Sequence, residues 1–185
     1  MSESDREQLL SGREDLAYHQ MRVLMLVEAV ASSDGHAGKL DGLTKLAKLD
    51  FLVRYPDLAR QVLDDIDESD SRSAIGSSYL DVEAPMTRYK YGPWDDRYYA
   101  IIGALVGRGL LRYVKGRRGS VALKPTPAGK RLATALASSE EWADTARQCQ
   151  TVARASSGLT GSALKDRIYA RLPDVLDRPY REVIQ

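Results

Sequence analysis

The segment over residues 107–132, GRGLLRYVKGRRGSVALKPTPAGKRL, constrains the fold more than any other part of the chain. Gly109 follows an apolar run and suits the left-handed position that ends a helix. Residues 110–124 then predict a hairpin, because the turn GRRG places a glycine on each side of its tip. Thr126 suits the N-cap of a following helix and Pro127 its first turn. A helix, a stop, a hairpin and a capped helix in this order predict a winged helix-turn-helix core.

Hydrophobic residues at helical spacing predict further helices before and after this core. The expected helices are about 16–31, 42–54, a short one from Pro56, 94–108, 127–138, 139–156 and 162–172, with a short strand over 86–91. The fold class is therefore mainly α with a small β hairpin, a winged helix-turn-helix core with flanking N- and C-terminal helices. The expected organisation is a flexible N-terminus over 1–15, a winged-helix domain over 16–137 with an acidic insertion over 64–83, and a C-terminal helical extension over 138–185.

Several polar residues of the expected helices have simple local explanations. Asp41 suits the N-cap of the helix at 42–54. Asp50 and Arg54 are four positions apart, so we expect them to pair on the exposed surface of that helix. Neither His19 nor His36 has a cysteine or histidine partner at the spacing of a metal site. We therefore expect both histidines to be ordinary surface or boundary side chains.

The other candidates for chemistry are weak. The single cysteine, Cys149, lies in line with Ala146 and Ala153 on one helix face, so we expect it in the core. Asp95 and Asp96 are neighbours that diverge on a helix, and the helix dipole explains acids at its start. We expect no catalytic residue, metal, cofactor or enzyme activity. One cysteine and no long apolar segment lead us to expect a cytoplasmic protein without a membrane span.

The charges of the chain are separated along the sequence, although its formal net charge is only +1. Nine basic residues and no acid lie over 97–131, whereas eight acids and two arginines lie over 57–83. The expected hairpin carries the candidate nucleic-acid-binding residues Arg112, Lys115, Arg117, Arg118 and Lys124. We favour contacts between these side chains and phosphates, which would be independent of sequence and sensitive to salt. The alternative is a solvated hairpin that only keeps the protein soluble.

The helix before the hairpin carries a stripe of small residues, Ala100, Gly103, Ala104 and Gly107. In a winged helix that reads sequence, this helix enters the major groove and presents polar side chains to the bases. Small residues cannot form such contacts, but they let another segment approach closely. The stripe is therefore a candidate partner-binding face, and packing of the two glycines inside the same domain is the open alternative.

Two segments, GLTKLAKLDFLVRYP at 42–56 and RYKYGPWDDRYYAIIGALVGRGLL at 88–111, resemble the middle component of bacterial ABC-three-component defence systems, the group that includes Lamassu. The tail LTGSALKDRIYARLPDV at 159–175 resembles the closing helix of such proteins. The resemblance implies a small winged-helix subunit without catalytic residues. Its implied partners are an SMC/ABC-type ATPase and a nuclease-like effector, which it would bridge or restrain until foreign DNA is sensed.

Two other functions remain open from the sequence. The first is a winged-helix transcriptional regulator that dimerises through its terminal helices and binds one short palindrome far better than other DNA. The second is an antitoxin-like or protease-adaptor module that binds a single client. The main hypothesis is a non-enzymatic adaptor of a defence complex, in which the hairpin assists DNA or partner contact.

Overall fold

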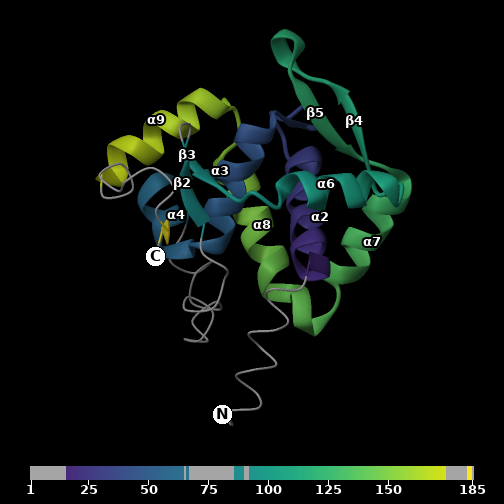
Figure 1. Ribbon diagram of the computed structural model, residues 1–185. Coiled ribbons are helices and arrows are strands. Elements are labelled where there is room, and N and C mark those ends of the chain that lie inside the picture. Colours follow the sequence, from purple (N-terminus) through teal and green to yellow (C-terminus); the bar gives the residue numbers. More distant parts are fainter. Residues whose placement is uncertain (1–15, 65, 67–85, 90–91, 174–182, 185) are drawn as a thin grey trace.

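The computed structural model describes residues 16–64, 66, 86–89, 92–173 and 183–184, and the structural statements below concern these residues. The chain is mainly helical, with small antiparallel sheets (Figure 1). The helices are α2 (Leu16–Ser32), α3 (Leu43–Arg54), α4 (Pro56–Val62), α6 (Tyr98–Gly107), α7 (Pro127–Ala137), α8 (Ala143–Ala155) and α9 (Gly161–Arg171), with short 3-10 turns η1 (Arg117–Gly119) and η2 (Glu140–Trp142). The strands are β1 (Leu40–Asp41), β2 (Met86–Tyr89), β3 (Gly92–Trp94), β4 (Leu111–Lys115), β5 (Val121–Pro125) and β6 (Val183–Ile184).

Helix α2 forms the centre of the hydrophobic core. Its residues Val23, Leu24, Leu26, Val27 and Val30 are fully buried. The helices α6, α7 and α8 and strand β5 all pack against it, and Figure 1 shows α2 standing between them. The helical spacing at 16–31 predicted this element, and the structure confirms it. Its apolar residues surround most of the helix because neighbours cover it from several sides.

The predicted hairpin is present as β4 and β5, and it extends beyond the helices at the top of Figure 1. Strand β1 pairs with β5, with Leu40 opposite Leu123, so the sheet order is β1-β5-β4. Gly109 ends α6 with a φ of 70°, as expected. Thr126 caps α7 by accepting the Gly129 N–H at 3.0 Å, also as expected.

The segment before α6 differs from its prediction. We expected a helix over 94–108, but residues 92–94 form strand β3, and α6 begins at Tyr98. Trp94 therefore belongs to a strand and not to the helix. Strand β3 pairs with β2, which confirms the short strand predicted near 86–91, and β2 also pairs with the C-terminal strand β6. Local spacing could not reveal this sheet, because its strands have only two to four residues and are defined by their partners.

The C-terminal helices share the core of the preceding helices. Helix α8 packs against α2 and α3, and α9 packs against α3 and α4. Cys149 on α8 is buried, as predicted, and burial raises the pKa of its thiol, so the thiolate is disfavoured. Gly158 separates the two helices with a φ of 72°, and Thr160 caps α9 by accepting the Ala163 N–H at 3.1 Å.

Two predicted regions lie outside the described residues. These are the N-terminus over 1–15 and the acidic insertion over 64–83, apart from Asp64 and Ile66. Within the described part of the chain, no helix combines the length and the apolar character needed to cross a bilayer.

Candidate nucleic-acid interface

The five predicted nucleic-acid-binding residues lie together on one projecting hairpin. Arg112, Lys115, Arg117 and Arg118 are exposed and Lys124 is half-buried. In the ladder, Arg112 lies directly opposite Lys124. Like charges at directly opposed positions destabilise a strand pair, so folding alone does not favour this arrangement.

The side chains of this group, which we call the basic hairpin (residues 111–125), have no acidic ion-pair partner in the part of the chain that the structure describes. Among the described residues, none of its five cationic side chains forms an ion pair with a carboxylate. Exposed surface arginines elsewhere do have such partners, as Arg171 has in Asp64 at 2.9 Å. The basic hairpin therefore presents a set of cationic side chains that no described carboxylate pairs with.

The tip of the hairpin has an uncommon backbone. Residues 117–119 form a 3-10 turn in which Arg118 has φ 52° and ψ 33°. This left-handed region costs an ordinary side chain about 1 kcal/mol or more and is occupied by few residues other than glycine. Gly119 follows with a φ of 81°, where a glycine is needed. The turn thus directs an arginine outward at the end of the hairpin, at some cost to folding.

Asp41 holds this tip, which corrects its predicted role as a helix cap. Helix α3 begins after Gly42 without any side-chain cap. The Asp41 carboxylate instead accepts the Arg117 backbone N–H, at 3.0 Å to each oxygen, and the Ser120 hydroxyl at 2.9 Å. Lys39, from the same segment, donates to the Lys115 carbonyl at 2.8 Å. Strand β1 therefore fixes the hairpin near its tip.

The predicted small-residue stripe on α6 faces away from the other described residues. Ala100, Gly103 and Gly107 are exposed and Ala104 is half-buried. A Cβ added at Gly103 or Gly107 would meet no described atom within 4 Å. Of the two interpretations of the stripe, packing inside the domain is therefore wrong for the described residues.

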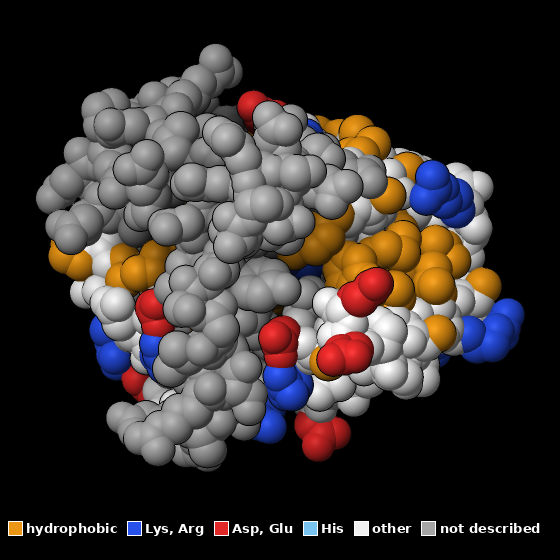
Figure 2. Space-filling model, turned by 90° about the horizontal axis from the view of Figure 1, so that it is seen from below, with side chains coloured by type: hydrophobic (Ala, Val, Ile, Leu, Met, Phe, Trp, Pro, Cys, Tyr) orange, Lys and Arg blue, Asp and Glu red, His pale blue; other side chains and the backbone are white. Residues whose placement is uncertain are grey.

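Apolar side chains on α6 and α7 are partly exposed. Tyr99, next to Ala100, is 68% exposed, and Val106 is half-buried. Leu132 and Leu136 of α7 are also only partly covered. Figure 2 shows hydrophobic side chains gathered at the right of the lower face, the side on which α6 and α7 lie in Figure 1, with basic side chains at its edge. An exposed apolar area with a polar border is typical of a protein-binding surface.

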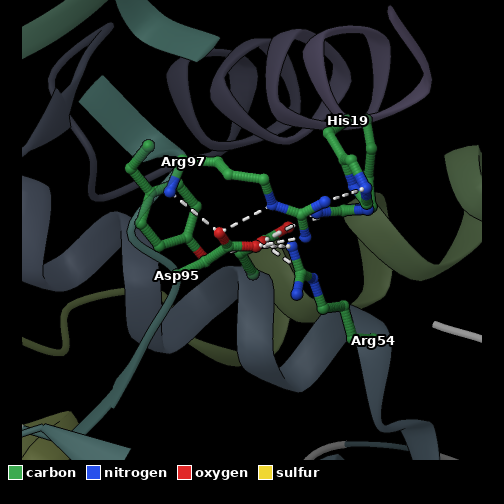
Figure 3. A network of polar contacts seen from close by, with 7 residues as sticks. His19, Arg54, Asp95 and Arg97 are labelled. Atoms are coloured by element: carbon green, nitrogen blue, oxygen red, sulfur yellow. Dashed lines mark hydrogen bonds and ion pairs between the residues drawn. The ribbon is translucent and has the colours of Figure 1, made fainter. Parts of the chain in front are cut away.

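A buried ionic network fixes the start of α6 against α2 and α3 (Figure 3). Fully buried Asp50 accepts the Arg22 Nε–H at 2.8 Å and the Tyr98 hydroxyl at 2.7 Å, and it pairs with Arg54 at 3.1 Å. Burial alone would raise the pKa of Asp50, but the charges of Arg22 and Arg54 lower it to about 2. The expected Asp50–Arg54 pair exists, but its place on the surface was wrong.

Asp95 belongs to the same network and is not a simple helix-start acid. Its carboxylate accepts from Arg54 Nη2 at 2.8 Å and from Arg97 Nε at 2.9 Å. The backbone N–H of Arg97 also donates to it, at 3.0 Å. Burial opposes ionisation, but the hydrogen bonds from Arg97 and the charge of Arg54 hold the pKa of Asp95 well below its ordinary value. Only Asp96 remains as an exposed acid at the start of α6.

Both histidines are buried, which contradicts the expectation of surface or boundary positions. His19 lies between two guanidinium groups, with Nδ1 at 2.8 Å from Arg22 and Nε2 at 3.0 Å from Arg97. Burial and then these two charges lower its pKa to about 3. His36 contacts the Ala153 carbonyl at 3.2 Å through Nε2, and burial and Lys45 lower its pKa. Both imidazoles are therefore neutral near pH 7.

The network explains the geometry of the site without adding a reactive group. Its carboxylates are occupied by arginines, and no set of three or more His, Cys, Asp or Glu side chains within the described ranges could hold a metal. The partners Arg22 and Asp50 lie 28 residues apart, and Asp50 and Tyr98 lie 48 apart. No local pattern reports contacts of this kind, so the sequence could not reveal the network.

Comparison with known proteins adds no assignment. No family model, no curated protein and no solved structure matches this chain.

Proposed function

We propose that the protein is a non-enzymatic winged-helix adaptor of a bacterial anti-phage or anti-plasmid defence complex. It bridges an SMC/ABC-type ATPase and a nuclease-like effector, and its basic hairpin contacts DNA phosphates independently of sequence. The observation that carries the DNA contact is the set of cations on the hairpin that no described carboxylate pairs with, including Arg112 directly opposite Lys124. The resemblance of segments 42–56 and 88–111 to middle components of such systems supports the assembly.

The order of the elements supports a winged-helix core. Helices α2, α3 and α6 precede the hairpin, with the short helix α4 and strands β2 and β3 between α3 and α6, and β1 lies between α2 and α3. The sheet that contains the hairpin has the order β1-β5-β4, so the hairpin that follows α6 is joined to the strand that follows α2. In helix-turn-helix proteins with such a wing, the last helix before the hairpin is the one that enters the groove.

The chemistry of α6 favours phosphate contact over base readout. Its exposed positions Ala100, Gly103 and Gly107 offer no side-chain donor or acceptor to a base edge, and exposed Tyr99 offers a single hydroxyl. Phosphate contacts need only positive charge and reach, which the hairpin supplies through arginines and lysines. The protein therefore binds duplexes of different sequence with similar affinity, and a conventional repressor is disfavoured.

The exposed stripe on α6 supports a protein partner. Small residues let a second helix or strand come close, and the half-covered apolar side chains of α6 and α7 supply area to bury. We assign the partner-binding role to Ala100, Gly103, Ala104 and Gly107. Expression with the products of the neighbouring genes tests this role, since the wild-type chain should co-purify with an ATPase and an effector.

A bulky substitution gives the matched control for co-purification. Gly103→Trp should abolish co-purification, whereas Ser138→Trp, at an exposed position just after α7, should not. Both variants should remain folded, because each position is exposed. Retention of the partners by the Gly103→Trp variant would contradict the proposed partner face.

Fluorescence anisotropy with two duplexes of unrelated sequence tests the DNA contact. Arg117→Ala with Arg118→Ala should weaken binding to both duplexes by about tenfold at low salt. Arg147→Ala with Arg167→Ala removes the same formal charge from α8 and α9, where these arginines already pair with acids. This control should bind almost as well as wild type. A strong preference for one palindromic duplex would instead support a transcriptional regulator.

A further inference from the structure

The tip of the basic hairpin is held by a residue that does not belong to the hairpin. Asp41 in β1 accepts the Arg117 N–H and the Ser120 hydroxyl, so its carboxylate closes the turn from outside. Within the turn, the Gly116 N–H donates to the Ser120 carbonyl at 2.7 Å. The carboxylate lies so close to Gly116 that a Cβ there would overlap it. The Gly116 position is thus left without a side chain where Asp41 needs the space.

The position of Asp41 is unfavourable for DNA binding if the hairpin acts only through its positive charge. Its carboxylate contacts the Arg117 backbone at the tip, and a negative charge there weakens the attraction of the tip for a polyanion. Its contacts show a different use. They hold a turn in which Arg118 has left-handed backbone angles, and an exposed turn in that conformation needs an external anchor to persist.

We propose that Asp41 is a positioning residue for nucleic-acid binding: it fixes the tip turn so that Arg118 is presented in one orientation to a backbone phosphate. The proposal rests on the proposed DNA contact of the basic hairpin. The side chain of Arg118 is exposed, and no described acid forms an ion pair with it, so it is free to serve this contact. A tip fixed before binding loses less conformational entropy when the complex forms, and this gain outweighs the repulsion from one carboxylate.

A positioning role and simple electrostatics predict opposite effects of one substitution on the affinity for a duplex. Asp41→Ala removes a negative charge beside the cations, so electrostatics alone predicts tighter binding to a duplex. Loss of positioning predicts binding that is weaker by about threefold or more. Asp34→Ala is the matched control, because Asp34 is exposed in the loop just before β1 and makes no side-chain contact with the tip. This control should leave affinity unchanged or slightly improved.

Two further variants separate positioning from an effect on the fold. Ser120→Ala removes one donor to Asp41 without changing any charge and should also weaken binding, by a smaller factor. In the Arg118→Ala background, Asp41→Ala should no longer weaken binding, because the two residues act through the same contact. Amide hydrogen exchange at Arg117 should accelerate in Asp41→Ala while exchange in α2 stays slow. That pattern would show a local change at the tip of a folded chain.

The outcomes distinguish this proposal from the proposed function. If the arginine double variant weakens DNA binding and Asp41→Ala tightens it, the hairpin contacts DNA and the positioning role is wrong. An Asp41→Ala loss of equal size in the Arg118→Ala background also overturns the role, because it would act through some other contact. If the wild-type chain binds no duplex at low salt, both proposals fail.

Discussion

At the scale of single residues, the structure shows how the core accommodates charge. Asp50 is fully buried, yet Arg22, Arg54 and Tyr98 surround its carboxylate with donors. Removing an ion from water is costly, and only this complete set of partners offsets the cost. The network therefore specifies how the start of α6 sits on α2 and α3, more than it adds net stability.

Breaking the buried network should lower the free energy of unfolding much more than breaking an ion pair on the surface. Asp50→Asn leaves Arg22 and Arg54 buried beside a neutral amide, so we expect the free energy of unfolding to fall by about 3–5 kcal/mol. Asp144→Asn removes an acid that pairs with Arg147 on the exposed surface of α8 and should cost less than about 1 kcal/mol. Urea unfolding of both variants checks this. Similar small losses would show that Asp50 is not held as described.

His19 predicts how stability depends on pH. The pKa of His19 is about 3 in the folded chain, against 6.5 for an unperturbed histidine. Below pH 6.5, this side chain is therefore protonated in the unfolded chain but stays neutral in the folded chain. Stability is therefore complete above pH 6.5 and falls as the pH drops from there, by up to about 1.4 kcal/mol per pH unit. His36 acts in the same direction.

His19→Gln tests this origin of the pH dependence. The variant cannot titrate, so the loss of unfolding free energy between pH 6.5 and 4.5 should shrink markedly, with His36 supplying what remains. Asp50 does not interfere in this range, because its stabilisation is lost only as the pH falls from about 3.8 toward about 2. An unchanged slope in urea unfolding from pH 4.5 to 7 would mean that His19 titrates normally.

At the scale of elements, two glycines on neighbouring helices have opposite surroundings. Gly103 in α6 faces open space among the described residues. Gly129, in the first turn of α7, lies so close to the Leu110 carbonyl that a Cβ would overlap it. The first glycine is therefore not required by this fold, whereas the second is required by the packing of α7 against the chain that leaves α6.

These surroundings predict opposite effects of one substitution. Gly103→Ala should raise the free energy of unfolding of the isolated chain by about 0.5–1 kcal/mol, because alanine restricts the unfolded chain and favours helix. Gly129→Ala should lower it by about 1 kcal/mol or more, because the backbone must shift. Thermal unfolding compares the two. Destabilisation by Gly103→Ala would indicate that some part of the chain covers the stripe.

The sequence predicted the longer elements well and the short ones poorly. Helices such as α2 and the hairpin β4–β5 follow from apolar spacing, a glycine stop and the cap at Thr126, which are all local signals. Strand β1 and strand β3 have two and three residues and exist only because distant strands pair with them. Asp41 and Asp95 were misread for the same reason, since each is fixed by partners that no local rule could supply.

The candidate site shows the same division. The five cations of the basic hairpin were predicted from an acid-free run of sequence, and the structure brings them together on one projection. Asp41 can anchor the tip only because β1 lies next to the hairpin in the fold. In the sequence, Asp41 and Arg117 are 76 residues apart. The positions of the charges can thus be predicted from the sequence, but the contacts that orient the charged side chains cannot.

At the scale of the whole molecule, charge separation matters more than net charge. The chain has a formal net charge of +1, so a uniform distribution would give it little attraction for DNA. The projecting hairpin concentrates positive charge at one end of the molecule, as Figure 1 places it. Binding through a few local phosphate contacts weakens as the salt concentration rises. The slope of this dependence is set by the number of counterions that the contacts release.

The salt dependence of duplex binding tests the central claim most directly. The logarithm of the association constant should fall linearly with the logarithm of salt concentration for the wild-type chain. The slope for Arg117→Ala with Arg118→Ala should be shallower by about 1.8, because each lost phosphate contact removes about 0.9. Identical slopes and affinities for the two proteins across the salt series would contradict contact between the basic hairpin and DNA.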